Sequence, residues 1–429
     1  MKLETQDTNY AATIVRVGET TKLEGLDNLV ALPFFGFQAL VPKSTRSGDL
    51  GVLFTAETQL SEEFCSKNNL FRHSEKNEDK VAKGYLEDNR RVRAIKLRGH
   101  TSSALFLSLD SLAVLGITGL KEGDTFTHID GVEICKKFRK PANPNRGPRE
   151  GRERKSRVID KLFPKHFDTE QFFKNYQKIP NGSLCVVTQK IHGTSGRFAH
   201  QAVQRKLTLL ERVAKWLGCK VQETEYAFFC GTRNTTKDPE ATSGHYYVDN
   251  VWSHWLEQIK HKIPKNWIIY GEIFGYTESG QPIQKGYTYS HDVGQSSFAV
   301  YRISVVNEDG VAVDLPWDSV VAWCKSAGVG HVAELHRITI GTFGRYWSQE
   351  ELVEYVQGLM DKKFLESGYF NVAMLSKDSP CDEGVCIRVD NGPVPLILKA
   401  KSPLFLQHET KCLDKGEVDM EEEAALDPA

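Results

Sequence analysis

The chain has 429 residues, enough for two or three domains, and its 40% hydrophobic and 26% charged residues are typical of a globular protein rather than a disordered one. The net charge of −1 hides an asymmetry: residues 136–157 carry ten lysines and arginines against two glutamates, whereas the last sixteen residues carry seven acids and one lysine. Nine scattered cysteines, never spaced Cys-x-x-Cys, argue against a disulfide framework or a zinc ribbon. No apolar run approaches ~18 residues, and the N-terminus is polar, so we expect a soluble intracellular protein, cytoplasmic or nuclear, without membrane contact.

The first 135 residues predict a small β-barrel of the OB type. Short segments rich in Val, Ile, Leu and Phe alternate with Gly, Asp, Ser and Pro turns, and they occupy residues 12–17, 28–37, 50–56, 92–97 and 104–109. The segments 92–98 and 103–108 together predict a hairpin. Its arginines and lysines fit either an RNA-facing surface or ordinary solvated charges.

Residues 136–160 predict a basic linker, because three prolines and almost no apolar side chain cannot build a core. Its charges suit contact with phosphates, and a nuclear-localisation patch is the alternative. The segment 412–429 predicts a disordered acidic tail with no assigned role.

The region 161–411 mixes predicted strands and helices, which indicates an α+β fold. Helical spacing covers residues 202–217, and a capping box at Ser348 opens a second helix that runs to about residue 364. Strand-like segments lie at residues 226–230, 267–272, 298–306, 384–389 and 396–400.

One lysine follows an apolar strand and precedes a glycine turn. Lys190 ends the run 186–190, and Gly193 would let the backbone approach a ligand closely, so Lys190 can serve as a nucleophile toward a nucleotide phosphate. A solvated strand end is the alternative. Lys399 and Lys401 share one strand face; they would lower the pKa of Lys190 from its ordinary ~10.4 and neutralise the phosphate. Glu383 is the candidate ligand for Mg²⁺ or Mn²⁺.

The order of these residues resembles motifs I, III, IIIa, IV and V of the covalent nucleotidyltransferases, which include RNA ligases, DNA ligases and capping enzymes. The matching stretches are residues 190–193, 270–275, 298–303, 383–387 and 398–401. The resemblance implies an adenylyltransferase domain (an ATP-grasp-like ligase domain) that uses ATP and Mn²⁺ or Mg²⁺. It implies that Lys190, Lys399, Lys401 and His192 are catalytic. Nucleotide contacts are implied for Gln189, Ile191, Gly193, Arg233, Glu272, Phe298, Lys399 and Lys401, and metal contacts for Glu383 and Glu272.

The arrangement is similar to RNA ligases with an N-terminal OB module, called RNA ligase family 5, because 28 residues follow Lys401 (429 − 401), too few for a barrel. The resemblance implies a monomeric repair enzyme that seals RNA 3′-OH and 5′-phosphate ends, at nicks or breaks, through lysyl-AMP and AppRNA. A capping-type guanylyltransferase and a non-catalytic RNA-binding protein are the alternatives.

Overall fold

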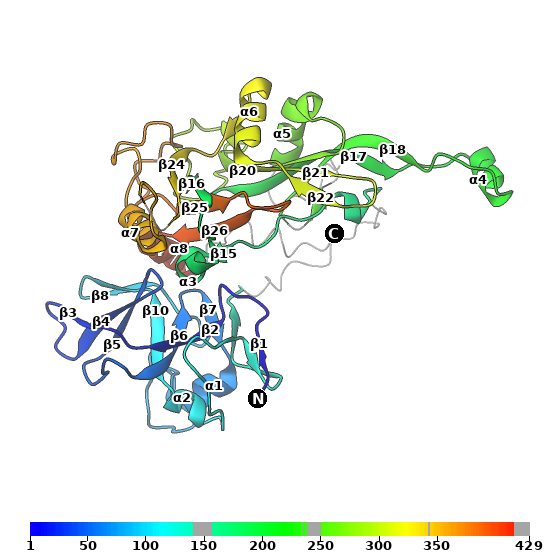
Figure 1. The fold of residues 1–429 in the computed structure, drawn as a ribbon. Helices are drawn as coiled ribbons and strands as arrows, with labels where there is room; N and C mark the ends of the chain where they lie inside the picture. Colours follow the sequence, from blue (N-terminus) through cyan, green and yellow to red (C-terminus); the bar gives the residue numbers. More distant parts are fainter. Residues whose placement is uncertain (140–156, 234, 238–249, 342–343, 416–429) are drawn as a thin grey trace. The chain divides into compact units, whose positions relative to one another are not determined.

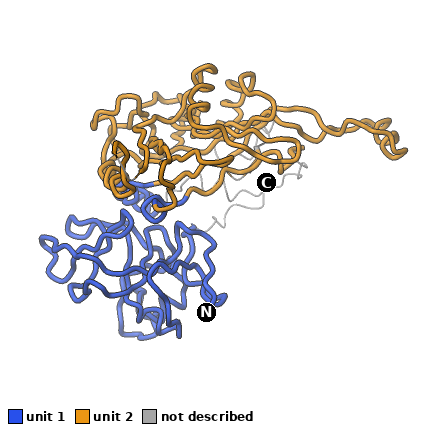
Figure 2. Tube along the Cα trace, viewed as in Figure 1, with its two compact units in different colours: residues 1–140, 170–176, 400–417 blue, residues 141–169, 177–399, 418–429 orange. Residues whose placement is uncertain are grey.

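The computed structural model describes residues 1–139, 157–233, 235–237, 250–341 and 344–415. The chain forms two compact units (Figure 2): unit 1 comprises residues 1–140, 170–176 and 400–417, and unit 2 comprises residues 141–169, 177–399 and 418–429. Most of the predicted basic linker and the tail from residue 416 lie outside the described residues. Within the described ranges, no helix has the length and apolar character needed to cross a membrane.

Unit 1 is built on a mostly antiparallel sheet over a buried core of Ile, Val, Leu and Phe side chains. The strand order is β11 (Thr125–Phe126), β2 (Ala12–Arg16), β6 (Leu50–Thr55), β10 (Ala104–Ser108), β5 (Phe37–Pro42), β4 (Leu29–Phe34) and β3 (Thr21–Lys22). The described pairing follows an open path from β11 to β3. Short additions are β1 (Leu3–Glu4), β7 (Thr58–Leu60), α1 (Glu62–Lys67), α2 (Asp110–Ala113), β12 (His128–Ile129), β13 (Val132–Glu133), β14 (Cys135–Lys137), β15 (Glu170–Gln171) and α3 (Phe172–Asn175).

Two turns correct the strand predictions in unit 1. The segment 28–37 divides into β4 and β5, because Phe35 and Gly36 adopt positive φ (49° and 74°) and reverse the chain. The predicted hairpin has a different partner: β8 (Ile95–Leu97) pairs with β9 (His100–Ser102), while β10 pairs with β6 and β5. A tight turn at Arg98 and Gly99 (φ 48° and 89°) makes this shorter pairing possible.

The last described helix, α8 (Pro403–Asp414), belongs to unit 1 and continues past residue 412, where the tail was predicted to begin. Arg91, only 1% exposed, reaches both Glu57 and Asp414. Thr410 Oγ1 donates to Glu57 Oε1 (3.1 Å) and accepts from the Ala94 amide (3.2 Å). These bonds account for the ordered last turn of α8.

Unit 2 contains two sheets, joined by the chain that leaves β16 (Leu184–Lys190) and enters β17 (Thr194–Gln204) (Figure 1). In the first sheet β16 lies between β25 (Gly384–Val389) and β24 (Glu334–Thr339), and β26 (Leu396–Lys401) follows β25. The second has the order β19 (Thr236–Lys237), β18 (Thr224–Gly231), β17, β20 (Trp267–Gly275), β21 (Ser296–Val306) and β22 (Ala312–Asp314), and β23 (Gly330–His331) also pairs with β21.

The helices of unit 2 are α4 (Leu209–Trp216), α5 (Val251–Ile259), α6 (Trp317–Ala327) and α7 (Gln349–Leu359). The predicted helix 202–217 was too long: its first residues pair with β18 as part of β17, and a capping box of Thr208 and Glu211 starts the helix later. The capping box at Ser348 is confirmed as the start of α7.

Candidate active site

Lys190 lies where the chain passes from one sheet of unit 2 to the other. It is the last residue of β16, opposite Gly384 on β25, so the residue before Gly384 is brought next to it. The Nζ atom of Lys190 lies 2.6 Å from Oε1 of Glu383. The Glu383 side chain is 1% exposed and that of Lys190 is 24% exposed, so the nucleophile candidate can be reached while its carboxylate partner is buried.

Gln189, the residue before Lys190, is hydrogen-bonded to a second buried acid, Asp382. The side-chain Nε2 of Gln189 donates to Asp382 Oδ1 (2.7 Å) and to the Ala373 carbonyl, and its Oε1 accepts from the Ala373 backbone amide. Asp382 Oδ2 accepts from the Phe364 amide (2.7 Å), and burial raises the Asp382 pKa to about 6. Sequence analysis missed Asp382, although its place beside Glu383 was a usable signal.

Backbone hydrogen bonds fix the turn after Lys190. The Gly193 amide donates to Glu272 Oε1 (3.1 Å), and Gln284 Nε2 donates to the Gly193 carbonyl (2.8 Å). A Cβ at Gly193 would lie 2.3 Å from the Ile273 carbonyl oxygen, so this position requires glycine.

The His192 amide donates to Tyr289 Oη (2.7 Å). The His192 ring meets the Tyr287 ring edge-on, with 5.3 Å between centroids. Burial, and then the negative charge of Glu383, raise the Tyr289 pKa well above its usual value, so its hydroxyl stays protonated. Apart from their aromatic character, nothing in the sequence distinguished either tyrosine.

Four predicted charged residues lie around one thiol. Burial raises the Cys386 pKa to about 11, and the charges of Lys190, Glu383, Lys399 and Glu272 also act on it. Lys190 pairs with Glu383, Glu272 accepts from the nearby Gly193 amide, and Lys399 is on β26, the neighbour of β25. Two cations and two carboxylates from four separate stretches of sequence therefore come together in unit 2.

His166 is affected by a second set of charges, which includes Arg233. Burial lowers the His166 pKa well below its usual value, and the positive charges of Arg302, Arg233 and Lys399 lower it further. Arg233 forms an ion pair with Asp168. Lys401 is paired with Glu409 (2.9 Å) and lies over the Phe405 ring, contacts that belong to unit 1.

Arg197 has a structural role. Its guanidinium donates to the carbonyls of Phe163, Pro164, Thr232 and Thr235, so its donors are directed to backbone rather than to a ligand.

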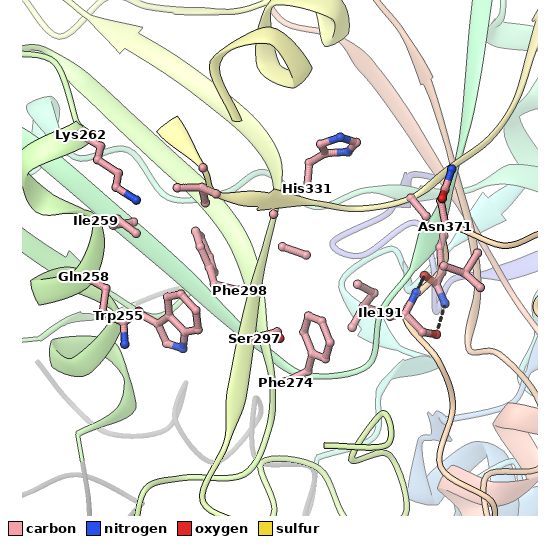
Figure 3. A pocket seen from close by; sticks show the side chains of 18 residues that line it. Ile191, Trp255, Gln258, Ile259, Lys262, Phe274, Ser297, Phe298, His331 and Asn371 are labelled. Carbon is pink, nitrogen blue, oxygen red and sulfur yellow. Dashed lines mark hydrogen bonds between the residues drawn. The ribbon is translucent and has the colours of Figure 1, made fainter. Parts of the chain in front are cut away.

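A cavity of about 460 Å³ lies beside Gln189 and Ile191, the two neighbours of Lys190 in the chain, and Figure 3 shows its lining. Gln189, Ile191 and Phe298 line it, together with residues that the sequence did not single out: Trp255, Gln258, Lys262, Phe274, His331 and Asn371. The Phe298 ring packs against Trp255, with 5.8 Å between centroids. This volume suits a nucleobase or a similar small planar group.

The register separates the cavity from the charged region. Phe298 lies opposite Ile273, and Glu272 lies opposite Ala299, so Phe298 and Glu272 leave the sheet on opposite faces. Gln189 and Lys190, as adjacent strand residues, also point to opposite sides. A nucleotide that contacts both the cavity residues and the charged residues must therefore cross the end of β16.

The two carboxylates fit a divalent cation that also binds phosphates. Among the described residues, no group of three or more His, Cys, Asp and Glu side chains is arranged to hold a metal. Mg²⁺ commonly uses only one or two protein carboxylates and takes its other ligands from phosphates and water. Glu383 and Glu272 supply two carboxylates on the Lys190–Gly193 turn, one beside Lys190 Nζ and the other beside the Gly193 amide.

Comparisons with known proteins agree with this geometry. The model of the family described as RNA ligase matches residues 184–401, and no curated protein matches the chain. The structure is similar to Naegleria gruberi RNA ligase with PPi (TM-score 0.58, 20% identity, 93% of this chain and 98% of that one). It is also similar to two lysine mutants of that ligase: one with ATP and Mn (TM-score 0.55, 18% identity, 94% and 99% covered) and one with AMP and Mn (0.56, 18%, 92% and 98%). At these identities the likeness establishes a shared fold over nearly the full chain.

Proposed function

This chain belongs to the RNA ligase family, and we propose that it joins RNA 3′-OH and 5′-phosphate ends with ATP, through lysyl-AMP and AppRNA. The observation that carries the proposal is the pairing of Lys190 with the buried Glu383, in the same small region as Lys399 and Glu272. A solvated strand end would not bring four predicted residues together.

In the first step, Lys190 Nζ loses a proton and attacks the α-phosphorus of ATP. The N–P bond forms, the bond to the β-phosphate oxygen breaks, and pyrophosphate leaves. Lys399, which shares the region around Cys386 with Lys190, stabilises the charge that gathers on the phosphate. The structure of the related ligase with ATP and Mn supports this choice of substrate.

In the next two steps the AMP moves to the RNA 5′-phosphate, and the RNA 3′-OH then attacks that phosphate and releases AMP. Arg233, which forms an ion pair with Asp168, is assigned a phosphate contact by motif. Lys401 is assigned to the same phosphate by motif, and His192 is assigned to orient the turn that carries Lys190.

The adenine base would occupy the cavity lined by Gln189, Ile191 and Phe298. The ribose would cross the strand end toward Glu272, which Gly193 also contacts. Glu383 and Glu272 would hold Mn²⁺ or Mg²⁺, which neutralises phosphate charge when bound.

We further infer that unit 1 is an OB-type module that grips RNA beside the break. Five strands of five or six residues (β2, β4, β5, β6 and β10) and an open sheet path support a partly open barrel. The basic segment from Lys136 would add phosphate contacts. Nick repair by a monomer, acting on a duplex whose ends are already close together, is the activity that this arrangement favours.

The test is sequential. The protein is incubated with labelled ATP or GTP, and then with nicked duplexes that have RNA or DNA on each side of the nick. We expect an acid-labile AMP adduct and sealing of nicks with an RNA 3′-OH end. A GMP adduct would indicate a capping-type enzyme, and the absence of any adduct would indicate a non-catalytic RNA-binding protein.

A further inference from the structure

Helix α4 exposes an apolar face at the end of the hairpin formed by β17 and β18 (Figure 1). None of its residues is buried. Its large apolar side chains are mostly exposed: Leu209 by 79%, Leu210 by 83%, Val213 by 53%, Trp216 by 84% and the adjoining Leu217 by 66%. At 100° per residue these five side chains gather on one side of the helix. An apolar face of this kind on a surface helix indicates a binding partner.

The opposite face of α4 is tied to the hairpin. Glu211 forms an ion pair with Arg205 at the end of β17, and Lys215 Nζ lies 2.5 Å from Glu223 Oε2 just before β18. The same Glu211 completes the capping box with Thr208. Because both ion pairs are on the charged face, the apolar face is directed away from the hairpin.

The charge around the apolar face is positive. Each of the two ion pairs has zero net charge. Three further cations lie in the helix or within a few residues of it in the sequence: Lys206, Arg212 and Lys220. No ion pair joins them to another of the described residues. Electrostatics therefore favours an anionic partner.

We propose that α4 is an interfacial anchor that inserts its apolar face into an anionic lipid surface, while Lys206, Arg212 and Lys220 contact the head groups. A helix with Trp and Leu on one face and basic residues beside that face has the composition of such anchors. The expectation of no membrane contact considered only spanning segments, and an anchor of this kind does not span.

A second copy of the chain is a less suitable partner for this face. A helix of eight residues is only about 12 Å long, so two such helices bury far less than the ~1,200 Å² of a stable protein interface. A lipid surface does not require a complementary shape, and apolar burial with charge attraction is sufficient.

The full-length protein would be mixed with phosphatidylcholine vesicles, with or without about 30% phosphatidylserine, and bound protein measured by flotation. We expect binding only to the anionic vesicles, weakening as salt rises. The double variant Leu210→Asp with Trp216→Asp should lower the bound fraction about tenfold. The matched control is Val81→Asp with Val311→Asp, two exposed apolar residues on other elements, which should bind as the unaltered protein does.

Lysyl-AMP formation in solution should be unchanged in the α4 variant, which shows that the chain is folded. Three results would overturn the proposal: no flotation of the unaltered protein, equal flotation of the α4 variant, or equal loss in the control variant. If light scattering shows a dimer that the α4 variant abolishes, a second copy covers the face instead.

Discussion

The ammonium group of Lys190 lies 2.6 Å from the carboxylate of Glu383, although the two residues are far apart in the sequence. The pair orients the lysine but also favours its charged form, which cannot attack phosphorus. A reaction therefore requires Glu383 to release Lys190, and a cation bound with ATP would draw the carboxylate away. Glu383 would thus pair with Lys190 before ATP binds and with the cation afterwards.

Replacement of Glu383 by Gln should lower the rate of lysyl-AMP formation by ~100-fold, because it removes a carboxylate that would hold the divalent cation at the phosphate. The measurement is single-turnover transfer of labelled AMP. Glu308→Gln, on the exposed turn after β21, is the control. A rate within twofold of the unaltered protein would remove Glu383 from the reaction.

Lys190→Ala should abolish the AMP adduct, because no other group replaces the nucleophile. Intact-protein mass spectrometry would detect one added AMP in the unaltered protein and in Lys325→Ala, which alters an exposed lysine of α6. An adduct on Lys190→Ala would place the nucleophile elsewhere.

Gly193→Ala should impair adenylylation and stability together, because the new methyl group would lie 2.3 Å from the Ile273 carbonyl. We expect a loss of ~1–3 kcal/mol in the free energy of unfolding. Gly358→Ala is the matched control: this glycine lies inside α7 with open space around it, so the change should be neutral or stabilising. Similar unfolding curves for both variants would contradict the close approach at Gly193.

The stability of the protein should depend on the ionisation of Asp382. Burial raises its pKa to about 6 from 3.8, so the folded state binds more protons than the unfolded state between these values. The contribution of Asp382 to the free energy of unfolding is therefore largest below about pH 4, and it falls by up to ~3 kcal/mol as the pH rises toward 6. The difference in unfolding free energy between the unaltered protein and Asp382→Asn should decrease over that range. A difference that is flat or increases with pH would mean that the pKa of Asp382 is not raised in the folded state.

Arg91→Ala should destabilise unit 1 by ~3 kcal/mol, because it leaves Glu57 buried without its cation. Hydrogen exchange should show faster opening of α8, whose Asp414 also loses a partner. Arg72→Ala, which breaks an exposed pair with Glu87, should change stability by less than ~1 kcal/mol. Slow exchange of α8 in the Arg91 variant would show that other contacts hold this helix.

Sequence analysis performed best where periodicity and chemistry agreed. The strand that ends at Lys190, the capping box at Ser348 and strand β25 at residues 384–389 all occur as predicted. The ordered motifs also indicated the family, whose model matches residues 184–401.

The remaining features depend on contacts that a linear pattern does not contain. Helical spacing across residues 202–204 was misleading, because pairing with β18 overrides local preference there. The packing of α8 into unit 1 depends on Arg91 and Glu57, more than 300 positions away from Thr410 and Asp414. The bond between Gln189 and Asp382 likewise appears only when β16 and β25 are aligned.

Because β16 pairs with β25, the candidate active site can be completed only after most of the chain has been synthesised. Lys190 leaves the ribosome 193 residues before Glu383 (383 − 190), and its strand cannot pair with β25 until residues 384–389 have followed. A nascent chain, or a product truncated before that point, holds the nucleophile without its carboxylate and without Lys399. Such products should be inert toward ATP, so incomplete chains would not consume nucleotide or capture RNA ends that they cannot seal.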